Sequence, residues 1–196
     1  MSFDISHLLE KWDYQPGEVV ARRFKGKDGR EKIQLRIDLG VLQMNADGRP
    51  DGKRPLGHES LLEFFEAKLA RHIQEHNGDD GGFTLSAEDC SRLQQEAIQY
   101  HHRYICLYEL QDYDGVLRDT ERNLAVFDLV EEYAESDGLA WSLQQFRPQL
   151  MLMRTRAKAT VALAKDDFGS AVQSIEEGLT AVRSFHKERG QDELAD

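Results

Sequence analysis

One phrase occurs twice in this chain, and it restricts the folds open to the C-terminal half more than any other feature. Each copy is an apolar stretch, a polar turn that ends in aspartate, an aromatic residue and a second apolar stretch. The aspartates are Asp112 and Asp167, and the aromatic residues are Tyr113 and Phe168. In both copies a small or branched residue follows three positions after the aromatic one, and leucine follows eleven after it. This pattern predicts a helix-turn-helix unit, present twice.

The spacing of apolar residues predicts four long helices in this half. Ser86 is a suitable N-cap for the first helix, and Gly138 ends the second. Pro148 lies in the third, where it starts or kinks the helix. The predicted spans are 87–110, 113–137, 139–164 and about 168–189.

The N-terminal part carries β-strand signals instead. Apolar residues alternate strictly with other residues from Ile33 to Val41, as in a strand with one buried face. A β-prone stretch at 18–24 precedes it, and the turn 26–29 contains the Asp-Gly pair that favours a hairpin. A two-stranded ribbon is marginal alone, so its apolar face must rest on a helix or on a second copy in a homodimer.

A helix is predicted after Ser60, which begins a capping box, and the glycine-rich run 77–82 ends it. This run separates a β-hairpin plus helix in residues 1–82 from an all-helical part in residues 83–196. The predicted fold is therefore mainly α with a small α+β N-terminal portion, in which antiparallel helix pairs follow the hairpin and its helix.

The repeated phrase resembles degenerate tetratricopeptide repeats. The small positions of the second helix are occupied by Val116 and Ala171, and the later ones by Asn123 and Gly178. The aromatic residue that opens the repeat is matched by Tyr100 but not in the second unit. The units are 55 residues apart, against about 34 in tandem repeats, so longer helices are expected. The resemblance implies a surface that holds other molecules.

Two further segments, 42–55 and 118–124, are similar to blocks in a family of uncharacterised bacterial proteins. Some of those proteins carry an additional helical hairpin like the interaction motif shared by UvrB and UvrC. That hairpin is not recognisable in this sequence, and the resemblance implies no established activity.

The formal net charge of −11 disfavours broad nucleic-acid binding, which needs a concentrated basic face. No apolar run is long enough to span a membrane and no basic-apolar leader is recognisable, so a cytoplasmic location is expected. His72 and His76 share a helix face but lack further ligands in a metal-binding order, and no cofactor motif is present.

A basic stripe is predicted on the third helix, where Arg147, Arg154 and Lys158 follow spacings of seven and four. Arginine forms forked hydrogen bonds with carboxylates, so the stripe is a candidate site for a partner's acidic side chains. The alternative is that it pairs with acids of the preceding helix. Those acids include Asp119, Glu131 and Glu132.

The loop 45–57 is the second candidate site. Arg49, Lys53 and Arg54 offer cations to an anion, and the glycines of the loop permit close backbone approach. Asp47 and Asp51 cancel most of this charge, and the turn chemistry equally fits a rigid connector.

These observations predict a non-enzymatic adaptor that docks a protein or peptide partner on its first and third long helices. The alternative is a small-ligand or nucleic-acid-linked regulatory module that uses the loop 45–57. No nucleophile, base and orienting group appear together, so no catalytic residue is predicted.

Overall fold

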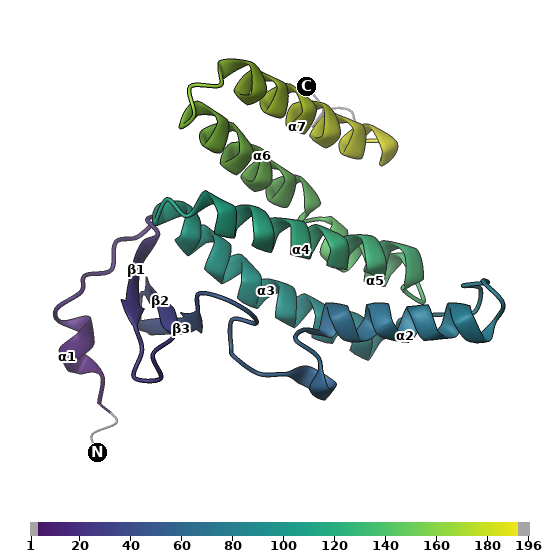
Figure 1. Ribbon diagram of the computed structural model, residues 1–196, viewed down its shortest axis with the longest axis horizontal. Helices are drawn as coiled ribbons and strands as arrows, with labels where there is room; N and C mark the ends of the chain where they lie inside the picture. The colour runs from purple at the N-terminus through teal and green to yellow at the C-terminus, as the bar shows by residue number, and fades with distance from the viewer. Residues whose placement is uncertain (1–3, 192–196) are drawn as a thin grey trace.

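The computed structural model describes residues 4–191, and it has the mainly helical fold expected, with a small sheet near the N-terminus (Figure 1). A short helix and three strands come first: α1 (Ser6–Leu9), β1 (Val20–Lys25), β2 (Glu31–Ile37) and β3 (Gly40–Asn45). They are followed by η1 (Pro55–Gly57), α2 (Leu61–Glu75), α3 (Ala87–Glu109), α4 (Tyr113–Tyr133), α5 (Asp137–Gln144), α6 (Arg147–Leu163) and α7 (Phe168–Glu188). No helix in this part of the chain is both long and apolar enough to cross a bilayer.

The strands form an antiparallel sheet in the order β1-β2-β3. The predicted hairpin turn is present, and the amide of Gly29 donates to the carbonyl of Gly26 at 3.0 Å. The prediction of one strand from Ile33 to Val41 was wrong, because the chain reverses after Ile37 and pairs Ile37 with Gly40. The alternation runs through this turn without a break, since Leu39 at its tip is apolar yet 87% exposed.

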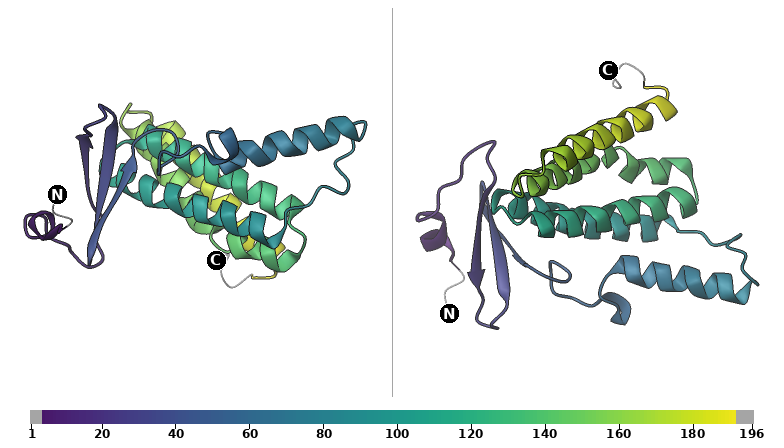
Figure 2. Two further views of the ribbon diagram at one scale, coloured as in Figure 1. Left: turned by 90° about the horizontal axis from the view of Figure 1, so that it is seen from below. Right: turned by 45° about the horizontal axis from the view of Figure 1, so that its top comes forward.

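Both faces of the sheet are covered. On one face Ile33 and Leu35 are buried in the same core as the helices. On the other face Arg36 donates to the carbonyl of Trp12 at 2.8 Å, and the Arg22 guanidinium lies 4.0 Å from the centre of the Trp12 ring. The sheet therefore stands across one end of the helices, with the N-terminal segment on its far side (Figure 2).

The repeated phrase forms the same turn twice. Gln111 and Asp166 take left-handed φ angles of 59° and 57°. Each following aspartate, Asp112 or Asp167, caps the next helix by accepting the amide three residues on at 3.0 Å. The turns join α3 to α4 and α6 to α7, and α4 packs against α6 between the two pairs (Figure 1).

The small residues of the second helices mark where the pairs come closest. A Cβ on Gly178 would collide with the side chain of Thr155, so glycine is needed for α7 to approach α6 this closely. At the corresponding place in the first pair, the Asn123 amide donates to the carbonyl of Ala97 at 2.9 Å.

The predicted third helix is two helices, α5 and α6, and Gly138 lies inside α5 rather than at the end of α4. The chain leaves α4 at Ala134, which is extended and bridges to Leu85. The amide of Leu85 donates to Tyr133, and the amide of Glu135 donates to Leu85. The interval of 55 residues thus contains an extra helix as well as long ones.

The apolar core is continuous from the sheet to the helix pairs. It includes Ile33 of β2, Phe65 of α2, Leu107 of α3 and Leu150 of α6. The glycine-rich run 77–82 forms the connection between α2 and α3.

Candidate partner-binding groove

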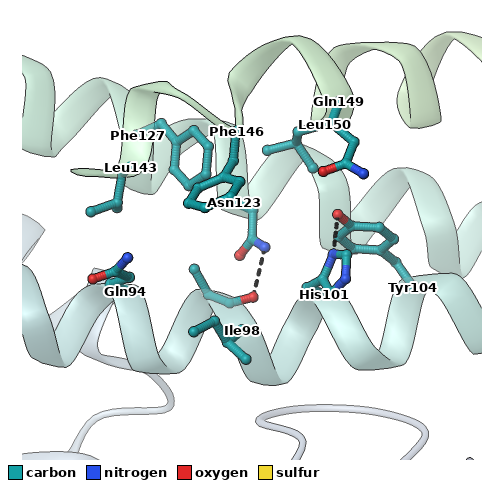
Figure 3. A pocket seen from close by; sticks show the side chains of 11 residues that line it. Gln94, Ile98, His101, Tyr104, Asn123, Phe127, Leu143, Phe146, Gln149 and Leu150 are labelled. Carbon is teal, nitrogen blue, oxygen red and sulfur yellow. Dashed lines mark hydrogen bonds between the residues drawn. The ribbon is translucent and has the colours of Figure 1, made fainter. Parts of the chain in front are cut away.

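A groove runs between α3 and α6, the first helices of the two pairs, with α4 as its floor. Two hollows follow one another along it. The first, of about 210 Å³, is lined by Ile98, His101 and Tyr104 of α3 and by Phe146, Gln149 and Leu150 at the start of α6 (Figure 3). Asn123 and Phe127 of α4 form its base.

The rim of the first hollow presents apolar side chains to solvent from both walls. Ile98 of α3 is 47% exposed and Phe146 is 49% exposed. Both side chains point toward the space between the helices (Figure 3). Facing apolar groups around a concavity are typical of a surface that another molecule covers.

The polar groups of the first hollow are neutral at physiological pH. The Nδ1 of His101 and the hydroxyl of Tyr104 lie 2.6 Å apart. Burial lowers the pKa of His101, as does the neighbouring His102. Burial also raises the pKa of Tyr104 to about 12. With no carboxylate, lysine or arginine among its lining residues, the first hollow suits an apolar group rather than an ion.

The second hollow, of about 370 Å³, lies further along the same groove, where α7 joins α6. Tyr108 of α3, Leu152 and Arg156 of α6, and Ile175 and Leu179 of α7 are among its lining residues. The Arg156 guanidinium lies 6.0 Å from the centre of the Tyr108 ring. This arginine is the one charged residue that lines either hollow.

The predicted basic stripe faces α4 instead of the groove. Arg147 pairs with Asp128 at 2.6 Å and with Glu131 at 3.5 Å, and Arg154 pairs with Glu121 at 3.2 Å. All three acids belong to α4. None of the stripe residues, Lys158 included, lines either hollow. Two positions after Arg154, about 200° further around the helix, Arg156 faces the groove, and the sequence pattern did not single it out.

The cations of the loop 45–57 do not converge on a common point in the structure. Arg49 pairs with Glu96 at 2.7 Å and with Asp51 at 2.8 Å. Arg54 pairs with Glu59 at 2.7 Å. The side chain of Lys53 makes no hydrogen bond or ion pair within residues 4–191.

A buried carboxylate, Glu96 of α3, anchors the loop 45–57 and the start of α2. It is fully buried and accepts the amide of Leu61 at 3.0 Å, the guanidinium of Arg49, and that of Arg122 from α4. Burial, with the nearby charge of Arg49, lowers the pKa of Arg122 to about 9. Three separate segments therefore meet at one carboxylate.

A second buried pair joins the same loop to the first helix pair. Arg103 of α3 makes two hydrogen bonds to Asp119 of α4, at 2.6 and 2.7 Å. Arg103 also donates to the carbonyls of Asn45 and Gly48. Arg118 donates to the carbonyl of Ala46 at 3.0 Å. The segments 42–55 and 118–124, which resemble blocks of one family, therefore lie against each other.

These buried charges escaped the sequence analysis, although a signal for them exists. Glu96, Tyr100, Arg103 and Leu107 follow spacings of four, three and four, so they lie on one side of α3. Two charged residues in line with a core tyrosine and leucine indicate buried ion pairs. The Tyr100 ring lies between the guanidinium groups of Arg103 and Arg122, at 4.9 and 4.2 Å from its centre.

Residues 4–191 hold no cluster of three or more His, Cys, Asp or Glu residues that could bind a metal ion. The rings of His72 and His76 stack at 4.0 Å, and His76 bonds to the carbonyl of His72. Cys90 and Cys106 are buried and unpaired with each other, and burial raises the pKa of Cys106 to about 12.

Comparison of the chain with protein-family models, with curated proteins and with solved structures finds no match.

Proposed function

We propose that this protein is a non-enzymatic adaptor that holds an apolar segment of a protein partner in the groove between α3 and α6. The observation that carries the proposal is the first hollow, whose two walls expose Ile98 and Phe146 toward each other. An apolar side chain of the partner would fill the hollow, and these two side chains would close over it.

The surroundings of the hollow support this role. Its uncharged lining favours an apolar group, and the amides of Gln94 and Gln149 at the rim offer hydrogen bonds to a peptide backbone. In this proposal Arg147 and Arg154 stabilise the wall formed by α6 through their pairs with α4, instead of contacting the partner. The loop 45–57 supports α3 from the other side.

The test is affinity capture from the native cell extract with the intact chain and with two groove variants, Ile98→Glu and Phe146→Glu. Each variant places a carboxylate where the partner's apolar group would sit, so we expect at least a tenfold loss of a discrete bound protein, about 1.4 kcal/mol. Leu39→Glu is the matched control, because it changes an exposed apolar residue at the far end of the sheet.

Circular dichroism would establish that all variants stay folded. If both groove variants retained the same proteins as Leu39→Glu and the parent chain, the groove would not be the docking site.

A further inference from the structure

Helix α7 carries an apolar face that no part of the described chain covers. Phe168, Val172, Ile175 and Leu179 follow spacings of four, three and four, and each is between 43 and 65% exposed. By contrast, the side of α7 that faces α6 buries Ala171, and further along it buries Phe185. The helix is therefore apolar on two sides, one packed and one open.

The open face continues onto α6. Leu152 and Leu163 are also more than 40% exposed, and the second hollow lies between Leu152 and the α7 residues Ile175 and Leu179. The helix pair α6–α7 forms the outer end of the helical layers (Figure 1). A terminal helix pair of such an array needs a polar outer face to remain separate, and this one lacks it. The face therefore calls for an occupant.

A helix satisfies this face better than an extended segment or a lipid surface does. The exposed residues of α7 span eleven positions, about 16 Å, or three turns. A helix bonds its own amides and carbonyls, whereas an extended chain against apolar side chains would leave them unpaired. The net charge of −11 opposes contact with anionic lipids.

The two edges of the face carry opposite charges. Arg156 lies at the edge near α3, beside Tyr108. On α7, Leu179 lies about 80° from the buried Ala171, and Glu176 about 140° in the same sense, so Glu176 marks the opposite edge. Both side chains are exposed, and neither has an ion pair within residues 4–191.

These two charges also lie at the same level along the helix pair. Thr155 meets Gly178 where α6 and α7 come closest, and the helices run antiparallel. Arg156 is therefore level with Glu176 to within about one residue. A two-fold axis through the apolar middle of the face would exchange the two edges, so a cation would meet an anion at both.

We propose that the α6–α7 face binds a second copy of this chain about a two-fold axis, with Arg156 of each protomer paired with the partner's Glu176. The apolar side chains of α7, with Leu152 and Leu163 of α6, are buried between the two copies. The first hollow lies at the other end of the groove and stays open in this dimer, so the proposed adaptor function does not depend on it.

The mass in solution tests the dimer. Sedimentation of the intact chain across a wide concentration range should give twice the chain mass of 22.5 kDa. Ile175→Glu should give the monomer mass, since it places a carboxylate in the middle of the apolar face. Leu39→Glu, on the sheet, should leave the dimer intact.

A charge exchange tests the orientation. Arg156→Glu alone and Glu176→Arg alone should each weaken the dimer about tenfold, because each places like charges opposite one another. The double variant restores opposite charges at both edges and should recover affinity to within about threefold of the parent chain.

A monomer mass at every concentration would overturn the proposal and assign the face to a different protein or to a lipid surface. A dimer that survives Ile175→Glu, or a double variant no tighter than the single ones, would overturn it as well. Circular dichroism on each variant separates these results from unfolding.

Discussion

Among individual residues, the buried pair Arg103–Asp119 has the greatest influence on stability. Both side chains are at most 1% exposed, and the two are joined by a bidentate bond. Burying two charges costs much of what their attraction returns, so the pair itself adds little net stability. Removing one member is different, because it leaves an uncompensated charge in the core.

We expect Asp119→Ala to lower the free energy of unfolding by about 3–5 kcal/mol, since it strands the charge of Arg103. Glu121→Ala is the matched control on the same helix. It breaks the exposed pair with Arg154 and should cost less than about 1 kcal/mol. Urea denaturation at neutral pH measures both, and equal losses would mean that Asp119 is not the buried counter-ion described.

At the scale of secondary-structure elements, the repeated phrase proved the most reliable guide. It predicted both turns and their capping aspartates because turn chemistry is local and depends on few residues. The third strand and the separate helix α5 were missed for the opposite reason. Leu39 continues a strand pattern through a turn, and the pairing of Ala134 with Leu85 that interrupts the helix is set by a residue far away in the chain.

The two matching turns differ in what they contact. Asp112 also pairs with Arg23 of β1, so the first turn ties the sheet to the helix pair, whereas Asp167 bonds only locally, to Ser170. Partial burial acts to raise the pKa of Asp112, but the bonds from Arg23 and Gly115 outweigh it and hold that pKa below 3.8. The charged form is therefore favoured by folding.

From this we predict a pH-dependent effect of Asp112→Asn, in which asparagine keeps the cap and loses the charge. A lowered folded-state pKa means that the stabilisation is complete above pH 3.8 and is lost as the pH falls through the lowered value. The variant should thus be less stable than the parent chain at neutral pH, by up to about 1 kcal/mol, and equally stable in acid.

Thermal unfolding across this pH range provides the measurement, with Asp167→Asn as the control at the matching turn. A deficit for Asp112→Asn that persists unchanged into acid would show that the pair with Arg23 does not contribute.

At the scale of the whole molecule, the sequence predicted the general location of the candidate site but not its residues. It assigned docking to the first and third long helices, and the groove lies between α3 and α6. The faces of α6 could not be told apart, because Arg147, Arg154 and Arg156 differ only in which neighbour lies opposite them. The same reason hid Glu96, whose counter-ions come from a distant loop and from α4.

The two proposed surfaces are compatible with each other. In a dimer formed through α6–α7, each copy keeps its first hollow accessible, so one dimer would present two docking grooves. Two linked grooves would bind a partner with two apolar segments more tightly than one groove does.

Photo-crosslinking from the groove tests the central claim most directly. A photoreactive phenylalanine analogue in place of Ile98 would be irradiated in living cells, with the same analogue in place of Leu39 as control. We predict a discrete protein adduct from position 98 that disappears when Phe146→Glu is added and is absent from position 39. An adduct unaffected by Phe146→Glu, or the same adducts from both positions, would contradict the docking groove.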